Sequence, residues 1–159
     1  MQFVFLGRGR EQYEEALMAM EARHPDHVRA FITFDNEKAH LVFAGADMFL
    51  MPSLYEPCGL SQMIAMRYGT VPVVRKTGGL ADTVTDLSDN LSSGGGFVME
   101  NYDHIELASI IRRAAKAFDS RVAWQRVVKR IMALDFSWKE PMLRYESLYK
   151  RILKYGAGE

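Results

Sequence analysis

The sequence has little cysteine and little histidine: its 159 residues include one cysteine, Cys58, and four histidines. A lone cysteine excludes a disulfide within the chain, which is typical of a reducing compartment. Twenty basic residues balance twenty acidic ones, so the charge gives no reason to expect binding to nucleic acid or to an anionic membrane. No apolar run is long enough to cross a bilayer. Residues 1–7 lack the basic segment of a signal peptide.

What the sequence does contain is a series of short apolar runs that alternate with helical patterns. We expect strands at 2–6, 28–34, 47–51, 71–74 and 97–99. We expect helices at 11–23, 36–44, 61–68, 79–85, 104–118, 121–134 and 140–153, with Asp35 or Asn36 capping the second and Asp103 the fifth. The pattern predicts an α/β fold with a Rossmann-like parallel sheet of about five strands and helices on both faces.

The length is that of a single domain, and its character changes along the chain. Residues 1–99 carry the β/α units, and residues 100–159 are helical after a polar, glycine-rich loop at 86–96. We expect the last three helices to form a C-terminal cluster in which Trp124 and Trp138 anchor the helices on the core.

One loop that carries candidate binding groups follows the strand at 47–51 and reads PSLYEPCGLSQ, from Pro52 to Gln62. In open parallel sheets, ligands bind outside the carboxyl ends of the strands. Glu56 lies in the rigid part of this loop, and Gly59 lets the backbone approach a ligand where a helix begins. A carboxylate there can accept hydrogen bonds from sugar hydroxyls or stabilise positive charge at an anomeric carbon.

A second loop, RKTGGL, follows the next strand and has the same design. Thr77, Gly78 and Gly79 precede a helix and predict a phosphate cradle, to which Arg75 and Lys76 add positive charge. Each loop alone is compatible with an ordinary turn. Two such loops in successive units at one sheet edge favour a site for a phosphorylated sugar.

The segment from Ala46 to Val84, ADMFLMPSLYEPCGLSQMIAMRYGTVPVVRKTGGLADTV, resembles the signature region of bacterial glycogen synthases and plant starch synthases. Looser similarity extends over LGRGREQYEE, GGGFVMENYDHIELASII and FSWKEPMLRYESLYKRIL. Those proteins are retaining glucosyltransferases of the GT-B fold, which has two Rossmann-like domains and an active site between them. Ile64 stands where many other GT-B enzymes carry a second glutamate, which favours this branch.

The resemblance implies transfer of glucose from ADP-glucose, or UDP-glucose, to the non-reducing end of an α-1,4-glucan, with retention and without a metal or other cofactor. Glu56 would contact the donor glucose, and Phe34 would stack on the nucleobase. The resemblance also implies a cytoplasmic protein, or one of the plastid stroma in a plant. Backbone groups of six residues would hold the glucose hydroxyls and the phosphates: Cys58, Gly59, Leu60, Thr77, Gly78 and Gly79.

The resemblance further implies that residues 1–159 are the C-terminal, donor-binding half of such an enzyme. The acceptor-binding N-terminal domain, the first strand of the C-terminal domain and a basic segment would lie outside them. The strands at 2–6 and 47–51 would then face a gap, and we expect them to pair with each other or two chains to form a homodimer. We expect no catalysis by this chain alone, because half of the cleft is missing.

Two other functions stay open at this point. One is a non-catalytic module that binds nucleotide sugar or glucan. The other is a different GT-B glycosyltransferase, of the sucrose or trehalose-phosphate type, against which Ile64 and the string from Glu56 to Leu60 argue.

Overall fold

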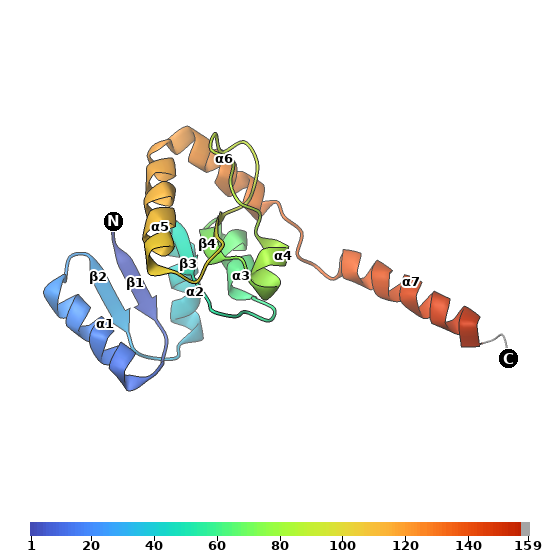
Figure 1. Cartoon of the computed structure of the whole chain (residues 1–159), viewed down its shortest axis with the longest axis horizontal. Helices are drawn as coiled ribbons and strands as arrows, with labels where there is room; N and C mark the ends of the chain where they lie inside the picture. The colour runs from blue at the N-terminus through green and yellow to red at the C-terminus, as the bar shows by residue number, and fades with distance from the viewer. Residues whose placement is uncertain (157–159) are drawn as a thin grey trace.

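A computed structural model describes residues 1–156 as five strands and seven helices (Figure 1). The strands are β1 (Phe3–Leu6), β2 (Val28–Phe31), β3 (Met48–Met51), β4 (Val71–Arg75) and β5 (Phe97–Met99). The helices are α1 (Glu11–Arg23), α2 (Asn36–Gly45), α3 (Ser61–Tyr68), α4 (Gly78–Thr83), α5 (His104–Asp119), α6 (Arg121–Met132) and α7 (Lys139–Gly156). Every predicted strand and helix is therefore present, with ends shifted by a few residues.

The strands are all parallel, as predicted, but they form two sheets and not one. β1 pairs with β2, and β3, β4 and β5 form a second sheet in that order. Pairing of β1 with β3, the first of the two expected alternatives, is not found among the described residues. Instead, Met48–Met51 is in register with Val71–Val74 over its whole length and Phe3–Leu6 is in register with Val28–Phe31, so β1 and β3 are each paired along one edge.

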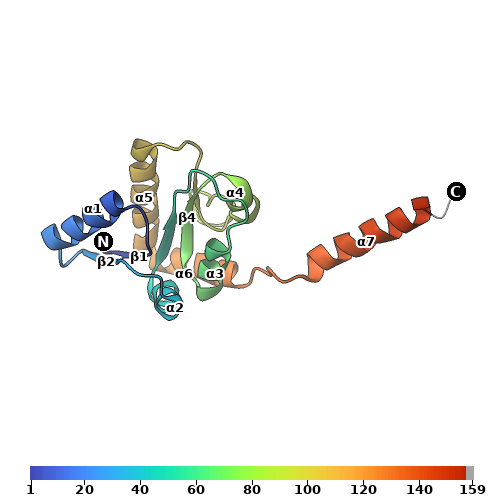
Figure 2. The same cartoon turned by 90° about the horizontal axis from the view of Figure 1, so that it is seen from below.

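The hydrophobic core lies around the second sheet. Helix α5 covers one face, and α3 and α4 cover the other, which Figure 2 shows on opposite sides of β4. Since β4 is covered on both faces, its residues Val71–Val74 are all buried, as expected for a continuous apolar run in a parallel sheet. Trp124 of α6 completes this core by stacking on Phe97, with ring centroids 6.3 Å apart.

The unit formed by α1, β1 and β2 is much less buried. Val28 is its one buried apolar residue among those described, and no residue of α1 is buried. The two parts of the chain therefore differ in stability, because apolar burial is the main favourable contribution to folding. The second sheet is the more buried part, and it carries both predicted loops.

Aspartates begin two of the helices. Asp35 Oδ1 accepts a hydrogen bond from the amide of Lys38 at 2.9 Å, which decides between the two predicted caps of α2. Asp103 Oδ1 accepts from the amides of Ile105 and Glu106 at 2.9 and 2.8 Å. These bonds satisfy amides that have no partner inside a helix, and they confirm the capping pattern in the sequence.

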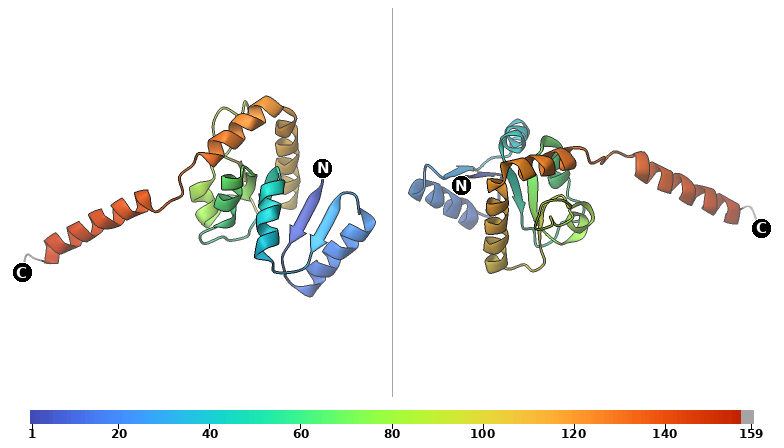
Figure 3. Two further views of the ribbon diagram at one scale, coloured as in Figure 1. Left: turned by 180° about the vertical axis from the view of Figure 1, so that it is seen from behind. Right: turned by 90° about the horizontal axis from the view of Figure 1, so that it is seen from above.

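Helix α7 extends away from the rest of the molecule in every view (Figures 1 and 3). The predicted C-terminal cluster therefore consists of α5 and α6, and α7 is not part of it. Trp124 is 5% exposed and anchors α6 as predicted, whereas Trp138 is 73% exposed and does not anchor α7. The difference arises because Trp138 follows the segment that leads away from the core. No helix in the described part of the chain is both long and apolar enough to span a membrane.

Candidate functional site

The two predicted loops lie side by side at one sheet edge. The first, residues 52–60, leaves the end of β3, and the second, residues 76–77, leaves the end of β4. Because β3 and β4 are adjacent and parallel, their carboxyl ends lie at the same edge. The first loop is here named the glutamate loop, and the second, extended into Gly78 and Gly79, is named the glycine loop.

The backbones of the two loops are in direct contact. The amide of Gly79 donates a hydrogen bond to the carbonyl oxygen of Glu56 at 3.0 Å. A Cβ atom at Gly78 would lie 2.0 Å from that oxygen, and one at Gly79 would lie 1.8 Å from the carbonyl oxygen of Cys58. No side chain fits at either position without moving backbone, so the paired glycines are required by this contact.

Two residues that sequence reasoning missed lie beneath these loops. Gln62 is buried in α3, and its Nε2 donates to Thr83 Oγ1 of α4 at 2.9 Å. Thr83 Oγ1 in turn donates to the carbonyl oxygen of Gly79 at 2.6 Å. The available signal was a glutamine in the first turn of a helix, directly after the loop, at a position that faces the core.

Arg75 supports the glutamate loop from below. Its Nε donates to the carbonyl oxygen of Ser53 at 2.9 Å, and its Nη2 donates to the carbonyl oxygen of Leu54. The guanidinium lies over the ring of Tyr102, 5.8 Å from the centroid. The predicted charge support is thus tied to the loop backbone, and its positive charge lies beside the glutamate loop.

Lys76 points toward the turn that follows β5. Its Nζ lies 2.9 Å from Glu100 Oε1, in an exposed ion pair. That turn is held by Glu106, whose carboxylate accepts hydrogen bonds from the amides of Glu100 at 2.7 Å and Asn101 at 3.0 Å. The amide of Glu100, followed by that of Asn101, lowers the pKa of Glu106 below its ordinary value.

The remaining predicted residues differ in how they are placed. Glu56 is half-buried, while Cys58 and Leu60 are exposed on the same loop. Gly59 has a φ of 70°, a left-handed conformation that favours glycine. Phe34 is 84% exposed and follows β2, so it belongs to the other sheet and not to the edge that carries the two loops.

A hollow of about 310 Å³ adjoins the glutamate loop at Pro52. Its volume is at the lower end of the usual range for small-molecule pockets, roughly 300–1,000 Å³. The other lining residues come from the end of β5 and the start of α5: Met99, Tyr102, Asp103, His104 and Leu107. Within residues 1–156, no three His, Cys, Asp or Glu side chains converge as metal ligands would.

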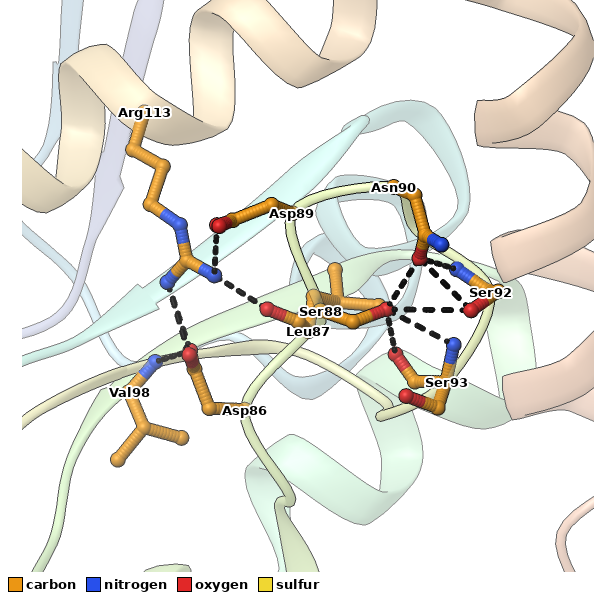
Figure 4. A network of polar contacts seen from close by, with 9 residues as sticks. All are labelled: Asp86, Leu87, Ser88, Asp89, Asn90, Ser92, Ser93, Val98 and Arg113. Atoms are coloured by element: carbon orange, nitrogen blue, oxygen red, sulfur yellow. Dashed lines mark hydrogen bonds and ion pairs between the residues drawn. The ribbon is translucent and has the colours of Figure 1, made fainter.

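A separate polar network fixes β5 beside β4 (Figure 4). Arg113 of α5 reaches both carboxylate oxygens of Asp86 at 2.9 Å and also donates to the carbonyl oxygen of Leu87. Asp86 Oδ1 accepts from the amide of Val98 in β5 at 2.8 Å. From the other side, Arg130 of α6 donates to the carbonyl oxygen of Gly94 at 2.8 Å. The polar loop predicted at 86–96 is therefore well anchored.

The fold and these loops match a known class of proteins. Residues 1–130 match the family described as Glycosyl transferases group 1, and the chain belongs to that family.

The chain is similar to curated glycogen synthases. The chain is 48% identical over 153 residues to a glycogen synthase of Geotalea daltonii, of which it covers 32%. It is 45% identical over 156 residues to a glycogen synthase of Kosmotoga olearia, of which it covers 33%. These alignments include 96% and 98% of the present chain. The chain thus spans about a third of the length of the curated relatives it matches.

Solved structures agree with this assignment. The catalytic domain of starch synthase IV from Arabidopsis thaliana, described as bound to ADP and acarbose, superposes with a TM-score of 0.84 at 37% identity. The match covers 94% of this chain and 32% of that one. A sucrose-phosphate synthase from Thermosynechococcus elongatus has a TM-score of 0.62 at 24% identity, which shows a shared fold only.

Proposed function

We propose that this chain is the donor-binding half of a retaining glucosyltransferase. In the whole enzyme, glucose would pass from ADP-glucose, or UDP-glucose, to the non-reducing end of an α-1,4-glucan. The observation that carries the proposal is the direct contact between the glutamate loop and the glycine loop, through the 3.0 Å bond from the Gly79 amide to the Glu56 carbonyl. One ligand with a sugar next to a diphosphate can reach both loops at once.

The proposed roles follow the position of each group. The carboxylate of Glu56 accepts hydrogen bonds from the donor glucose and stabilises charge at its anomeric carbon. Backbone groups of Cys58, Gly59 and Leu60 bind glucose hydroxyls and the nearer phosphate. The distal phosphate is held by backbone amides of the glycine loop. Because the Gly79 amide already donates to Glu56, the amides of Thr77 and Gly78 are those offered to the phosphate.

Charge and stacking complete the proposed donor site. Arg75 and Lys76 bring positive charge close to the diphosphate, and Phe34 stacks on the nucleobase. The exposed ring of Phe34 supports the latter role, since it is available to a ligand without rearrangement. ADP is favoured over UDP because the Arabidopsis starch synthase is described with ADP bound.

The glucan acceptor and the catalytic cleft are proposed to require the rest of the protein. The glycogen synthase relatives are about three times as long as this chain, which covers 32% of one and 33% of another. No cofactor other than the nucleotide-sugar substrate is proposed, and we place the enzyme in the cytoplasm.

Calorimetric titration with ADP-glucose, UDP-glucose and ADP tests the donor site. We expect the wild-type chain to bind ADP-glucose at millimolar concentration or below. Glu56→Gln should weaken ADP-glucose binding about tenfold, the effect of losing a charged hydrogen bond, and leave ADP binding unchanged because ADP carries no glucose. Glu15→Gln, an exposed change on α1, is the matched control and should bind like wild type.

Two results would redirect the proposal. If none of the three ligands gives a heat of binding at millimolar concentration, the chain would be a structural module without a donor site. Donor binding without glucosyl transfer, after the N-terminal half of a relative has been supplied, would favour a non-catalytic binding module.

We also propose that two chains associate through the outer edges of β1 and β3, because unpaired strand edges readily pair with other strands. Sedimentation should give the mass of a dimer, and the amides of both strands should be protected from hydrogen exchange. A monomer whose β1 and β3 amides exchange rapidly would contradict this.

A further inference from the structure

Gln62 is the most unusual buried polar residue in the described part of the chain. Its side chain is 0% exposed, and its Oε1 has no hydrogen-bond partner within residues 1–156. A buried acceptor without a partner lowers stability. An apolar side chain of similar length would occupy the same space without this cost. Packing therefore does not explain a glutamine here.

The hydrogen bonds of Thr83 determine how the amide of Gln62 is oriented. The single hydroxyl proton of Thr83 is used in the 2.6 Å bond to the carbonyl oxygen of Gly79. Thr83 Oγ1 can therefore only accept from Gln62, so Nε2 faces Thr83 at 2.9 Å and Oε1 stays unpaired. The side-chain amide of Gln62 therefore has a partner for Nε2 and none for Oε1.

These bonds belong to a closed set of contacts that includes both loops. Gly59 lies directly against the amide of Gln62, since a Cβ at Gly59 would be 2.6 Å from both Oε1 and Nε2. From Gln62 the contacts run to Thr83, then to the carbonyl of Gly79. The set closes with the amide of Gly79, which donates a hydrogen bond at 3.0 Å to the carbonyl oxygen of Glu56, in the same loop as Gly59.

We propose that Gln62 and Thr83 are positioning residues that hold the glutamate loop and the glycine loop at a fixed separation. They act through Gly59 and Gly79 and do not contact the donor. The inference rests on the proposed function of the two loops as a donor site. A ligand that contacts both loops binds more tightly when their separation is set in advance, because no ordering is needed on binding.

The experiment uses two disrupting variants and two controls. Gln62→Met keeps the length and approximate volume of the side chain but removes the Nε2 group that donates the hydrogen bond to Thr83. Thr83→Val removes the hydroxyl, and Thr83→Ser keeps it. Gln125→Met, on the exposed face of α6, controls for the change from glutamine to methionine. Each protein is measured for ADP-glucose affinity by calorimetry, for hydrogen exchange of the Gly79 amide, and for melting temperature.

We expect Gln62→Met and Thr83→Val to bind ADP-glucose about fivefold to tenfold more weakly, the factor produced by losing one hydrogen bond. Exchange of the Gly79 amide should rise by a similar factor in both, because its bond to Glu56 reports the loop separation. Thr83→Ser and Gln125→Met should behave like wild type. The melting temperature of Gln62→Met should not fall, since the substitution removes the unpaired Oε1 together with Nε2.

Three results would overturn the inference. The first is unchanged affinity and Gly79 exchange in both disrupting variants, and the second is an equal loss in Thr83→Ser. The third is a fall in the melting temperature of Gln62→Met in step with its affinity, which would mark an ordinary packing role. If the wild-type chain binds no nucleotide, the proposed function fails, and the exchange of Gly79 in the same variants still decides whether the two residues hold the loops.

Discussion

Replacing Gly79 by alanine should separate the two loops of the candidate site. The added Cβ would lie 1.8 Å from the carbonyl oxygen of Cys58 and 2.4 Å from its carbonyl carbon. Real Cβ atoms essentially never approach other atoms closer than 3.0 Å, and the atoms met here are backbone. The glutamate loop must therefore retreat by about 1 Å, because closely packed atoms leave no space to absorb the methyl group.

The expected cost combines three contributions. Overpacking of this kind costs about 1–3 kcal/mol. Loss of the hydrogen bond from the Gly79 amide to Glu56 adds about 1 kcal/mol. The higher helix propensity of alanine at the start of α4 returns up to about 1 kcal/mol. The net loss of unfolding free energy is then about 1–4 kcal/mol. For a chain of 159 residues this lowers the melting temperature by about 3–12 °C.

Thermal unfolding followed by far-ultraviolet circular dichroism measures this effect. The matched control is Gly45→Ala at the end of α2, where a Cβ would meet nothing within 4 Å. The control should melt at or slightly above the wild-type temperature, because only the helix propensity changes. We also expect Gly79→Ala to lose at least tenfold in ADP-glucose affinity. A Gly79→Ala variant that melts and binds like wild type would show that the loops are not in the close contact described here.

Four further predictions concern the support around the site and the two tryptophans of the C-terminal region. Arg113→Met removes the clamp on Asp86 and should cost about 1–2 kcal/mol, visible as faster hydrogen exchange in residues 86–96. Glu106→Gln tests pH dependence: because the folded-state pKa of Glu106 is lowered, its contribution to stability is present above its ordinary pKa of 4.5 and is lost as the pH falls below it. The variant should therefore lose less stability than wild type on acidification from neutral pH, and equal losses in thermal melts would contradict this. Trp124→Ala should cost about 3–5 kcal/mol by opening a core cavity. Trp138→Ala should stay within about 0.5 kcal/mol of wild type, and a large effect in denaturant unfolding would place it in the core.

Much of the site could be predicted because the chemistry is local in sequence. Short apolar runs predict strand ends at Met51 and Val74, the second one residue before the observed end at Arg75, and each loop is marked by glycines directly before a helix. Parallel strands that are neighbours in sequence order also bring their carboxyl ends to one edge. These rules place the two loops at one edge, and the contact between Glu56 and Gly79 is known only from the structure.

The support of that site could not be predicted, because it depends on contacts between distant segments. Gln62 and Thr83 are 21 positions apart, and the sequence gives no reason to join them. The sequence predicts that Arg75 adds positive charge, and only the structure shows that its guanidinium also donates to the loop backbone at Ser53. Such choices depend on side-chain directions, which are set only when α3, α4 and β4 are packed together.

The sequence by itself determined the order of helices and strands, the cap at Asp103, the choice of Asp35 or Asn36 as the other cap, and the two loops at one sheet edge. These features arise from apolar periodicity, from glycine conformation and from hydrogen bonds within a few residues. The tertiary structure alone decided that the strands form two sheets, that α7 leaves the core, and that a buried glutamine joins the loops. The reason is that strand pairing, helix packing and buried hydrogen bonds depend on contacts between distant segments, so no single segment determines them.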